Sequence, residues 1–128
     1  MDDNLYMEID LKQLANNISK ICQVKDIIPV IKSNAYGMGD IQVAQTIRAC
    51  GLKYVAVVDI FEAIRIAKNT KGLEILILNS VKKEDLEYLN YYSNLIISLN
   101  SKNDFEVLEN INFNRRLKVH IQIDTGMN

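Results

Sequence analysis

The sequence is poor in the residues that build zinc sites and disulfide frameworks. Its 128 residues include two cysteines, one histidine, one proline and no tryptophan. Two cysteines and one histidine are too few for a zinc site made only of cysteine and histidine ligands of one chain, and no metal site is expected. Cys22 and Cys50 lie far apart, outside any metal or redox spacing. They indicate reduced thiols and a cytoplasmic protein.

Long apolar runs and an excess of one charge are also missing. No apolar stretch reaches the roughly 18 residues that a membrane-spanning helix needs. The acidic start, Met1-Asp2-Asp3, lacks the basic region and apolar core of a signal peptide. Lysine and arginine number 15 against 16 aspartate and glutamate residues, a net charge of -1. We therefore expect neither a nucleic acid nor a membrane as partner.

Short apolar runs alternate with amphipathic stretches along the whole chain. Strands are predicted at 5–10, 27–32, 54–58, 74–78, 95–99 and 117–124, and helices at 11–24, 40–51, 60–69, 83–91 and 102–111. Asp10 and Asp40 are the predicted N-caps of the first two helices. After the first short strand, five strands joined by helices favour an α/β fold with a parallel sheet covered by helices.

Two architectures fit this order of elements. One is an open doubly wound sheet, and the other is the first part of a (β/α)8 barrel. The last strand places Leu117, Val119, Ile121 and Ile123 on one face, and Lys118, His120, Gln122 and Asp124 on the other. A barrel strand near a catalytic mouth and an edge strand with one solvated face would both show this alternation. The pattern alone leaves both architectures open.

Lys32 is the first candidate for chemistry, because it ends the apolar run 27–32. Catalytic groups of parallel α/β folds gather at that end of the strands. Desolvation there favours the neutral, nucleophilic form of an amine, which can form a Schiff base. The plainer interpretation is a lysine that extends from the strand end into solvent.

The loop after Lys32 carries two glycines, Gly37 and Gly39, before the helix that begins near Asp40. Such a helix start can offer N–H groups to an anion such as phosphate. An ordinary turn between strand and helix is the simpler interpretation, and Asp40 would compete for those donors. His120 is more typical of a structural residue than of a base. For Glu62, a role at the helix start is simpler than a role in a site.

Three segments together resemble the alanine racemase family of pyridoxal-phosphate-dependent amino-acid racemases. They are residues 7–11 followed by Leu14 and Asn17, residues 29–39, and residues 119–128. The second contains the signature Lys-x-Asn-Ala-Tyr-Gly-x-Gly, beginning at Lys32. Residues 55–57 with Glu62, Ala63 and Arg65 also fit the family.

The resemblance implies a partial (β/α)8 TIM barrel with about the first five barrel strands. Residues 1–128 would be the N-terminal segment of the barrel, without the family's C-terminal β domain. Lys32 would bind pyridoxal 5'-phosphate as an imine and act as one of two bases, and Tyr36 would donate a hydrogen bond to the phosphate. The substrate would be a small amino acid, L-alanine converted to D-alanine for peptidoglycan, and the complete protein a cytoplasmic homodimer.

The sequence departs from the family at three places. Gln122 stands where many members carry a carbamylated lysine, and Met38 where the signature usually has histidine. The chain also ends before the expected substrate-binding arginine and the tyrosine that acts as second base. We therefore expect a fragment that is inactive alone. The alternatives are a non-catalytic barrel protein that binds pyridoxal phosphate, a racemase domain for serine or another amino acid, and a structural remnant without ligand.

Overall fold

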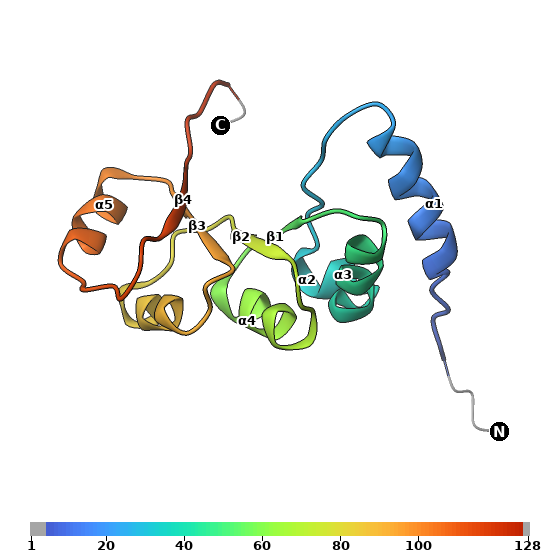
Figure 1. Cartoon of the computed structure of the whole chain (residues 1–128), viewed down its shortest axis with the longest axis horizontal. Coiled ribbons are helices and arrows are strands. Elements are labelled where there is room, and N and C mark those ends of the chain that lie inside the picture. The colour runs from blue at the N-terminus through green and yellow to red at the C-terminus, as the bar shows by residue number, and fades with distance from the viewer. Residues whose placement is uncertain (1–4, 127–128) are drawn as a thin grey trace.

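The computed structural model describes residues 5–126 as a parallel sheet with helices (Figure 1). The strands are β1 (Tyr54–Val57), β2 (Glu74–Ile77), β3 (Leu95–Leu99) and β4 (Lys118–Ile121). The helices are α1 (Leu11–Cys22), α2 (Lys32–Tyr36), α3 (Asp40–Ala49), α4 (Ile60–Asn69), the 3₁₀ helix η1 (Lys83–Asn90) and α5 (Lys102–Glu109). The alternation predicted from residue 40 onward is therefore confirmed, with η1 a 3₁₀ helix.

The strand order distinguishes between the two architectures. All strands are parallel, and the order is β1-β2-β3-β4, so each strand lies beside the one that precedes it in sequence. Val30 forms a parallel bridge with Ala56 at the other edge of β1. A doubly wound sheet reverses direction at a switch point, whereas a barrel adds strands in order. The structure confirms the prediction of a partial barrel.

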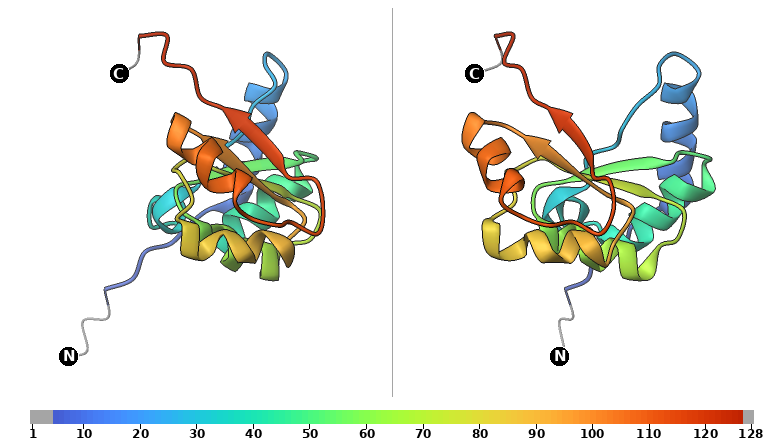
Figure 2. Two further views of the ribbon diagram at one scale, coloured as in Figure 1. Left: turned by 90° about the vertical axis from the view of Figure 1, so that its left-hand side faces the viewer. Right: turned by 60° about the vertical axis from the view of Figure 1, so that its left-hand side comes forward.

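The two faces of the sheet differ in what covers them. Alternate side chains such as Val55, Ile75 and Ile97 pack against α3, α4, η1 and α5 and form the main core. These helices lie along one side of the sheet (Figure 2). The other face, here called the helix-free face, carries a small cluster of Ala56, Leu76 and Ile96. In a complete barrel this face points to the interior.

Strand β4 shows the predicted alternation in a shorter form than 117–124. Lys118 and His120 pair in register with Ile96 and Ser98, so they share the helix-free face. There the Lys118 Nζ atom lies 2.7 Å from a carboxylate oxygen of Glu74 on β2. The other side of β4 is apolar but uncovered, since Val119 is 41% and Ile121 62% exposed.

The strand predicted at 5–10 is wrong. Leu5, Tyr6 and Met7 are exposed, and this segment forms no ladder with any described strand. An extended apolar pattern becomes a strand only where a neighbour accepts its backbone hydrogen bonds. Asp10, by contrast, is the N-cap of α1 as predicted, and its Oδ1 accepts a hydrogen bond from the Gln13 N–H at 2.8 Å.

The strand predicted at 27–32 is reduced to the single bridge at Val30. The Ile31 N–H donates to the Ala56 carbonyl at 2.8 Å, and the Ala56 N–H donates to the Pro29 carbonyl at 2.8 Å. Pro29 itself has no N–H to extend the ladder. The segment still takes the first strand position, and this fixes where Lys32 stands.

No helix within residues 5–126 is long and apolar enough to cross a membrane.

Candidate active site around Lys32

Lys32 lies at the carboxyl-terminal edge of the sheet, directly after the bridge to β1. The hydrogen bond from Ile31 to Ala56 fixes the backbone immediately before it. Its side chain is half-buried, and within residues 5–126 its Nζ atom has no hydrogen-bond or ion-pair partner. A primary amine therefore stands unengaged at the edge where barrel enzymes carry their chemistry.

The loop after Lys32 is a left-handed helical turn. Ser33, Asn34, Ala35 and Tyr36 have φ angles of 53°, 55°, 52° and 54°. For residues other than glycine this conformation costs about 1–2 kcal/mol each. Such strain persists only where the surroundings hold it in place. The sequence predicted a loop here and gave no sign of four consecutive residues with positive φ.

Glu62 on α4 holds the beginning of this turn. Its Oε1 accepts a hydrogen bond from the Ser33 N–H at 2.6 Å, and its Oε2 accepts one from the Val58 N–H at 3.1 Å. Glu62 lies in the first turn of α4 as expected, with Asp59 as the N-cap, but its carboxylate also reaches the loop after Lys32. The side chain of Glu62 thus joins the residue after Lys32 to the residue after β1.

Arg65, one helical turn further along α4, holds the other end of the loop. Its Nε atom donates to the Asp40 Oδ2 at 2.8 Å, and its Nη2 donates to the same oxygen. Asp40 is therefore not an N-cap as predicted; Gly39 takes that position, and the buried Asp40 carboxylate faces Arg65. Sequence reasoning missed these contacts, because their only signal was the three-residue spacing of Glu62 and Arg65 on one helix face.

The start of α3 is where the sequence suggested either an anion site or an ordinary turn. Its first N–H, that of Asp40, donates to the Asn34 Oδ1 at 3.0 Å. Asn34 also accepts a hydrogen bond from the Gly39 N–H through its carbonyl oxygen at 3.0 Å. Both glycines have positive φ, 88° at Gly37 and 92° at Gly39, as the tight return into α3 requires. One N–H of this helix start is therefore used within the loop.

Tyr36 ends the left-handed turn and is 61% exposed. Its hydroxyl group has no hydrogen-bond partner among the described residues, so it is free to donate to a ligand. Lys32 and Tyr36 therefore offer an amine and a phenol from one short, braced loop. This pair of donors suits a ligand that carries both a carbonyl carbon and a phosphate.

The remaining candidates lie elsewhere along the same edge. His120 is exposed on the helix-free face. Gln122 follows β4, where its N–H donates to the Leu99 carbonyl at 3.0 Å, four strand positions from Lys32. Met38 is partly exposed at the end of the loop. No hydrogen bond or ion pair joins His120 or Gln122 to Lys32 within residues 5–126.

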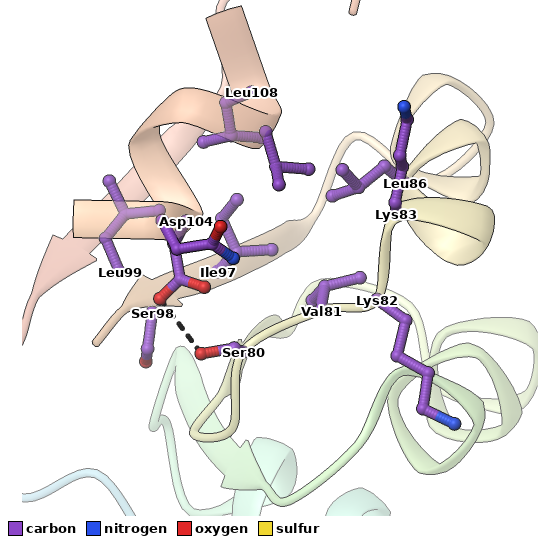
Figure 3. Close-up of a pocket in the computed structure, with 12 residues that line it drawn as sticks. Ser80, Val81, Lys82, Lys83, Leu86, Ile97, Ser98, Leu99, Asp104 and Leu108 are labelled. Atoms are coloured by element: carbon purple, nitrogen blue, oxygen red, sulfur yellow. Dashed lines mark hydrogen bonds between the residues drawn. The ribbon is translucent and has the colours of Figure 1, made fainter. Parts of the chain in front are cut away.

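A separate cavity of about 280 Å³ lies between η1, β3 and α5 (Figure 3). Two of its polar side chains serve the fold, because the Asp104 carboxylate accepts hydrogen bonds from the Ser80 hydroxyl at 2.9 Å and the Asn100 N–H at 2.7 Å. Burial raises the pKa of Asp104, but these bonds and those from Ser101 outweigh it and leave the pKa lowered. Neither Lys32 nor Tyr36 lines this cavity.

Over the part of the chain that the structure describes, no group of three or more His, Cys, Asp or Glu side chains could hold a metal ion. Cys22 and Cys50 are free thiols, the first exposed and the second half-buried.

A parallel sheet built in sequential order, with an unengaged lysine at the carboxyl end of its first position, defines the class: a segment of a (β/α)8 barrel with an amine at its catalytic edge. The family model for the alanine racemase N-terminal domain matches residues 9–128. The chain therefore belongs to the alanine racemase N-terminal domain family.

Individual relatives agree with this assignment. The chain is 32% identical over 126 residues to an alanine racemase of Fusobacterium nucleatum, covering 95% of this chain and 34% of that protein. It is 33% identical over 129 residues to an alanine racemase of Listeria monocytogenes, covering 95% and 33%. The chain thus spans about a third of the length of the curated relatives it matches.

Solved structures show the same fold. The crystal structure of alanine racemase from E. faecalis superposes with a TM-score of 0.84 at 28% identity, covering 93% of this chain and 34% of that one. The enzyme from Oenococcus oeni gives 0.83 at 31% identity, covering 94% and 34%. The enzyme from Bartonella henselae, solved with covalently bound pyridoxal phosphate, gives 0.70 at 26% identity, covering 79% and 29%.

Proposed function

We propose that residues 1–128 form the cofactor-holding N-terminal segment of a pyridoxal-phosphate-dependent alanine racemase. The complete protein would be a cytoplasmic homodimer that interconverts L- and D-alanine for peptidoglycan, and it would include a C-terminal β domain. The observation that carries the proposal is the unengaged Lys32 amine in the family's signature loop at the carboxyl edge of the sheet. Family membership supports the choice of reaction.

The donor set of the loop fits pyridoxal phosphate. Lys32 Nζ would hold the cofactor covalently, and the exposed Tyr36 hydroxyl would donate a hydrogen bond to a phosphate oxygen. When bound, the cofactor supplies the electron sink that stabilises charge at Cα of an amino acid. The braced turn fixes Lys32 before the ligand arrives, so that less freedom is lost on binding.

Lys32 would also move a proton. Its Nζ would take the proton from Cα on one face of the amino-acid substrate and return it as general acid. Racemisation requires a second group that protonates Cα from the opposite face. Lys32 supplies only the first, so we expect this chain alone to be inactive as a racemase and at most to exchange the α-hydrogen of one enantiomer.

Covalent trapping tests the proposal directly. Pyridoxal phosphate is added to the purified chain, sodium borohydride reduces the adduct, and mass spectrometry of peptides locates the modified lysine. The matched controls are Lys32→Ala and Lys53→Ala, since Lys53 is an exposed lysine at the opposite edge of the sheet. We expect one dominant modified peptide containing Lys32, lost in Lys32→Ala and kept in Lys53→Ala. Equal modification of many exposed lysines would refute the proposal.

A further inference from the structure

The carboxylate of Glu62 bridges two backbone segments. One oxygen accepts the N–H of Ser33, next to Lys32, and the other accepts the N–H of Val58, next to the end of β1. Glu62 is half-buried, and the bridge spans 29 positions in sequence to Ser33. The residue that follows the lysine is therefore fixed to the sheet through a single side chain.

Only a carboxylate satisfies both donors. It has two acceptor oxygens, whereas the amide of glutamine has one acceptor and one donor group. The Ser33 N–H lies in the first turn of α2, where no earlier helical carbonyl can accept it. Glu62 therefore supplies an acceptor that the backbone of the turn cannot provide.

The other side-chain hydrogen bonds of the loop lie away from Ser33 and do not replace the bond from Glu62. Arg65 and Asp40 hold the far end, at the start of α3. Asn34 bonds the Asp40 N–H within the loop. The start of α4 is capped by Asp59, so it does not depend on the Glu62 carboxylate. Loss of this carboxylate should therefore loosen the turn at Ser33, while the backbone bond from Ile31 to Ala56, the far end of the loop and α4 stay in place.

We propose that Glu62 is a positioning residue for Lys32: its carboxylate fixes the left-handed turn against β1 and thereby holds the lysine amine where the cofactor must meet it. This inference rests on the proposed function, because it concerns the orientation of Lys32 toward pyridoxal phosphate.

The test compares Glu62→Gln with Glu87→Gln, a matched change at an exposed glutamate on η1. Two quantities are measured: amide hydrogen exchange at Ser33 and Val58 by NMR, without cofactor, and the pyridoxal phosphate concentration that half-labels Lys32 after borohydride reduction. The labelling is done well below the thermal midpoint of each variant, which is recorded by circular dichroism.

Either orientation of the glutamine amide turns its NH₂ group against one of the two donors. We therefore expect Ser33 or Val58 in Glu62→Gln to exchange roughly tenfold faster, as expected for the loss of one hydrogen bond to a charged group. The half-labelling concentration for Lys32 should rise by a similar factor, while labelling of exposed lysines stays unchanged. Glu87→Gln should match the wild type in both measurements.

Three results would overturn the inference, and they differ. If the wild type labels Lys32 selectively and Glu62→Gln labels it equally well, Glu62 does not position the lysine, and the proposed function survives. If the wild type shows no selective labelling of Lys32, the proposed function fails and the inference fails with it. Unchanged exchange at both amides would show that the carboxylate does not hold the turn in solution.

Discussion

The ion pair between Arg65 and Asp40 should contribute more to stability than an ordinary surface pair. The Asp40 side chain is only 4% exposed, whereas that of Arg65 is 48% exposed. Replacing Arg65 by methionine keeps the apolar stem but leaves a buried carboxylate without its cation. We expect Arg65→Met to lower the free energy of unfolding by about 2–3 kcal/mol, the value of a hydrogen bond to a charged group that is partly open to water.

Replacing Asp40 by asparagine should lower the free energy of unfolding by less than Arg65→Met does. In Asp40→Asn the side-chain oxygen can still accept a hydrogen bond from Arg65, so we expect a loss of about 1 kcal/mol. The double variant leaves no buried charge unpaired. Its loss should therefore be smaller than the sum of the two single losses, with a coupling energy of about 1–2 kcal/mol.

Urea denaturation followed by circular dichroism measures all four proteins, and the slopes must agree for the energies to be compared. If the loss of unfolding free energy in the double variant equals the sum of the two single losses, the reasoning is refuted, since the two side chains then do not interact. A loss below about 0.5 kcal/mol in Arg65→Met would also refute it, because that is the range of exposed pairs.

Two further changes test other parts of the structure. The folded-state pKa of Asp104 is lowered below its ordinary value of 3.8, so its carboxylate stabilises the fold above that value, and this stabilisation is lost as the pH falls through the folded pKa. In urea denaturation at a series of pH values, Asp104→Asn should therefore be less stable than the wild type near pH 7 and approach it on acidification; a constant difference would contradict this. Because Ile121 is exposed on β4, an edge strand of the described sheet, we expect the wild type to associate through this strand at high concentration. Ile121→Lys should reduce that association in analytical ultracentrifugation and change the unfolding free energy by less than about 0.5 kcal/mol. Association equal to that of the wild type would mean that β4 is not the contact.

The sequence was sufficient for those elements whose signal is local. The strand at 54–57 and the helix at 60–69 were predicted because apolar spacing determines both burial and element type there. The N-cap at Asp10 was also local, since its acceptor lies three residues from the donor. Strand order was not local: the pattern of elements left a barrel and a doubly wound sheet open, the family resemblance favoured the barrel, and the strand order confirmed it.

The loop around Lys32 could not be predicted in detail. Ala35 has no intrinsic preference for positive φ, yet it is fully buried at φ 52°. The conformation depends on Glu62 and Arg65, which lie 29 and 25 positions from the groups they hold. The spacing of neighbouring residues along the chain does not predict contacts between residues so far apart in sequence. The signature identified Lys32 and Tyr36 as candidates, but it did not show how they are held.

The sequential order of the sheet has a consequence for how the chain folds. The paired residues Tyr54 and Glu74, Ile75 and Leu95, and Ile96 and Lys118 are 20, 20 and 22 positions apart. Each new strand therefore needs only the latest stretch of chain to reach its place, which keeps the entropy of loop closure small for a parallel sheet. The sheet can grow in the direction of synthesis, one βα unit at a time. At each stage the newest strand has one edge without a partner strand, and β4 is in this state in the described sheet.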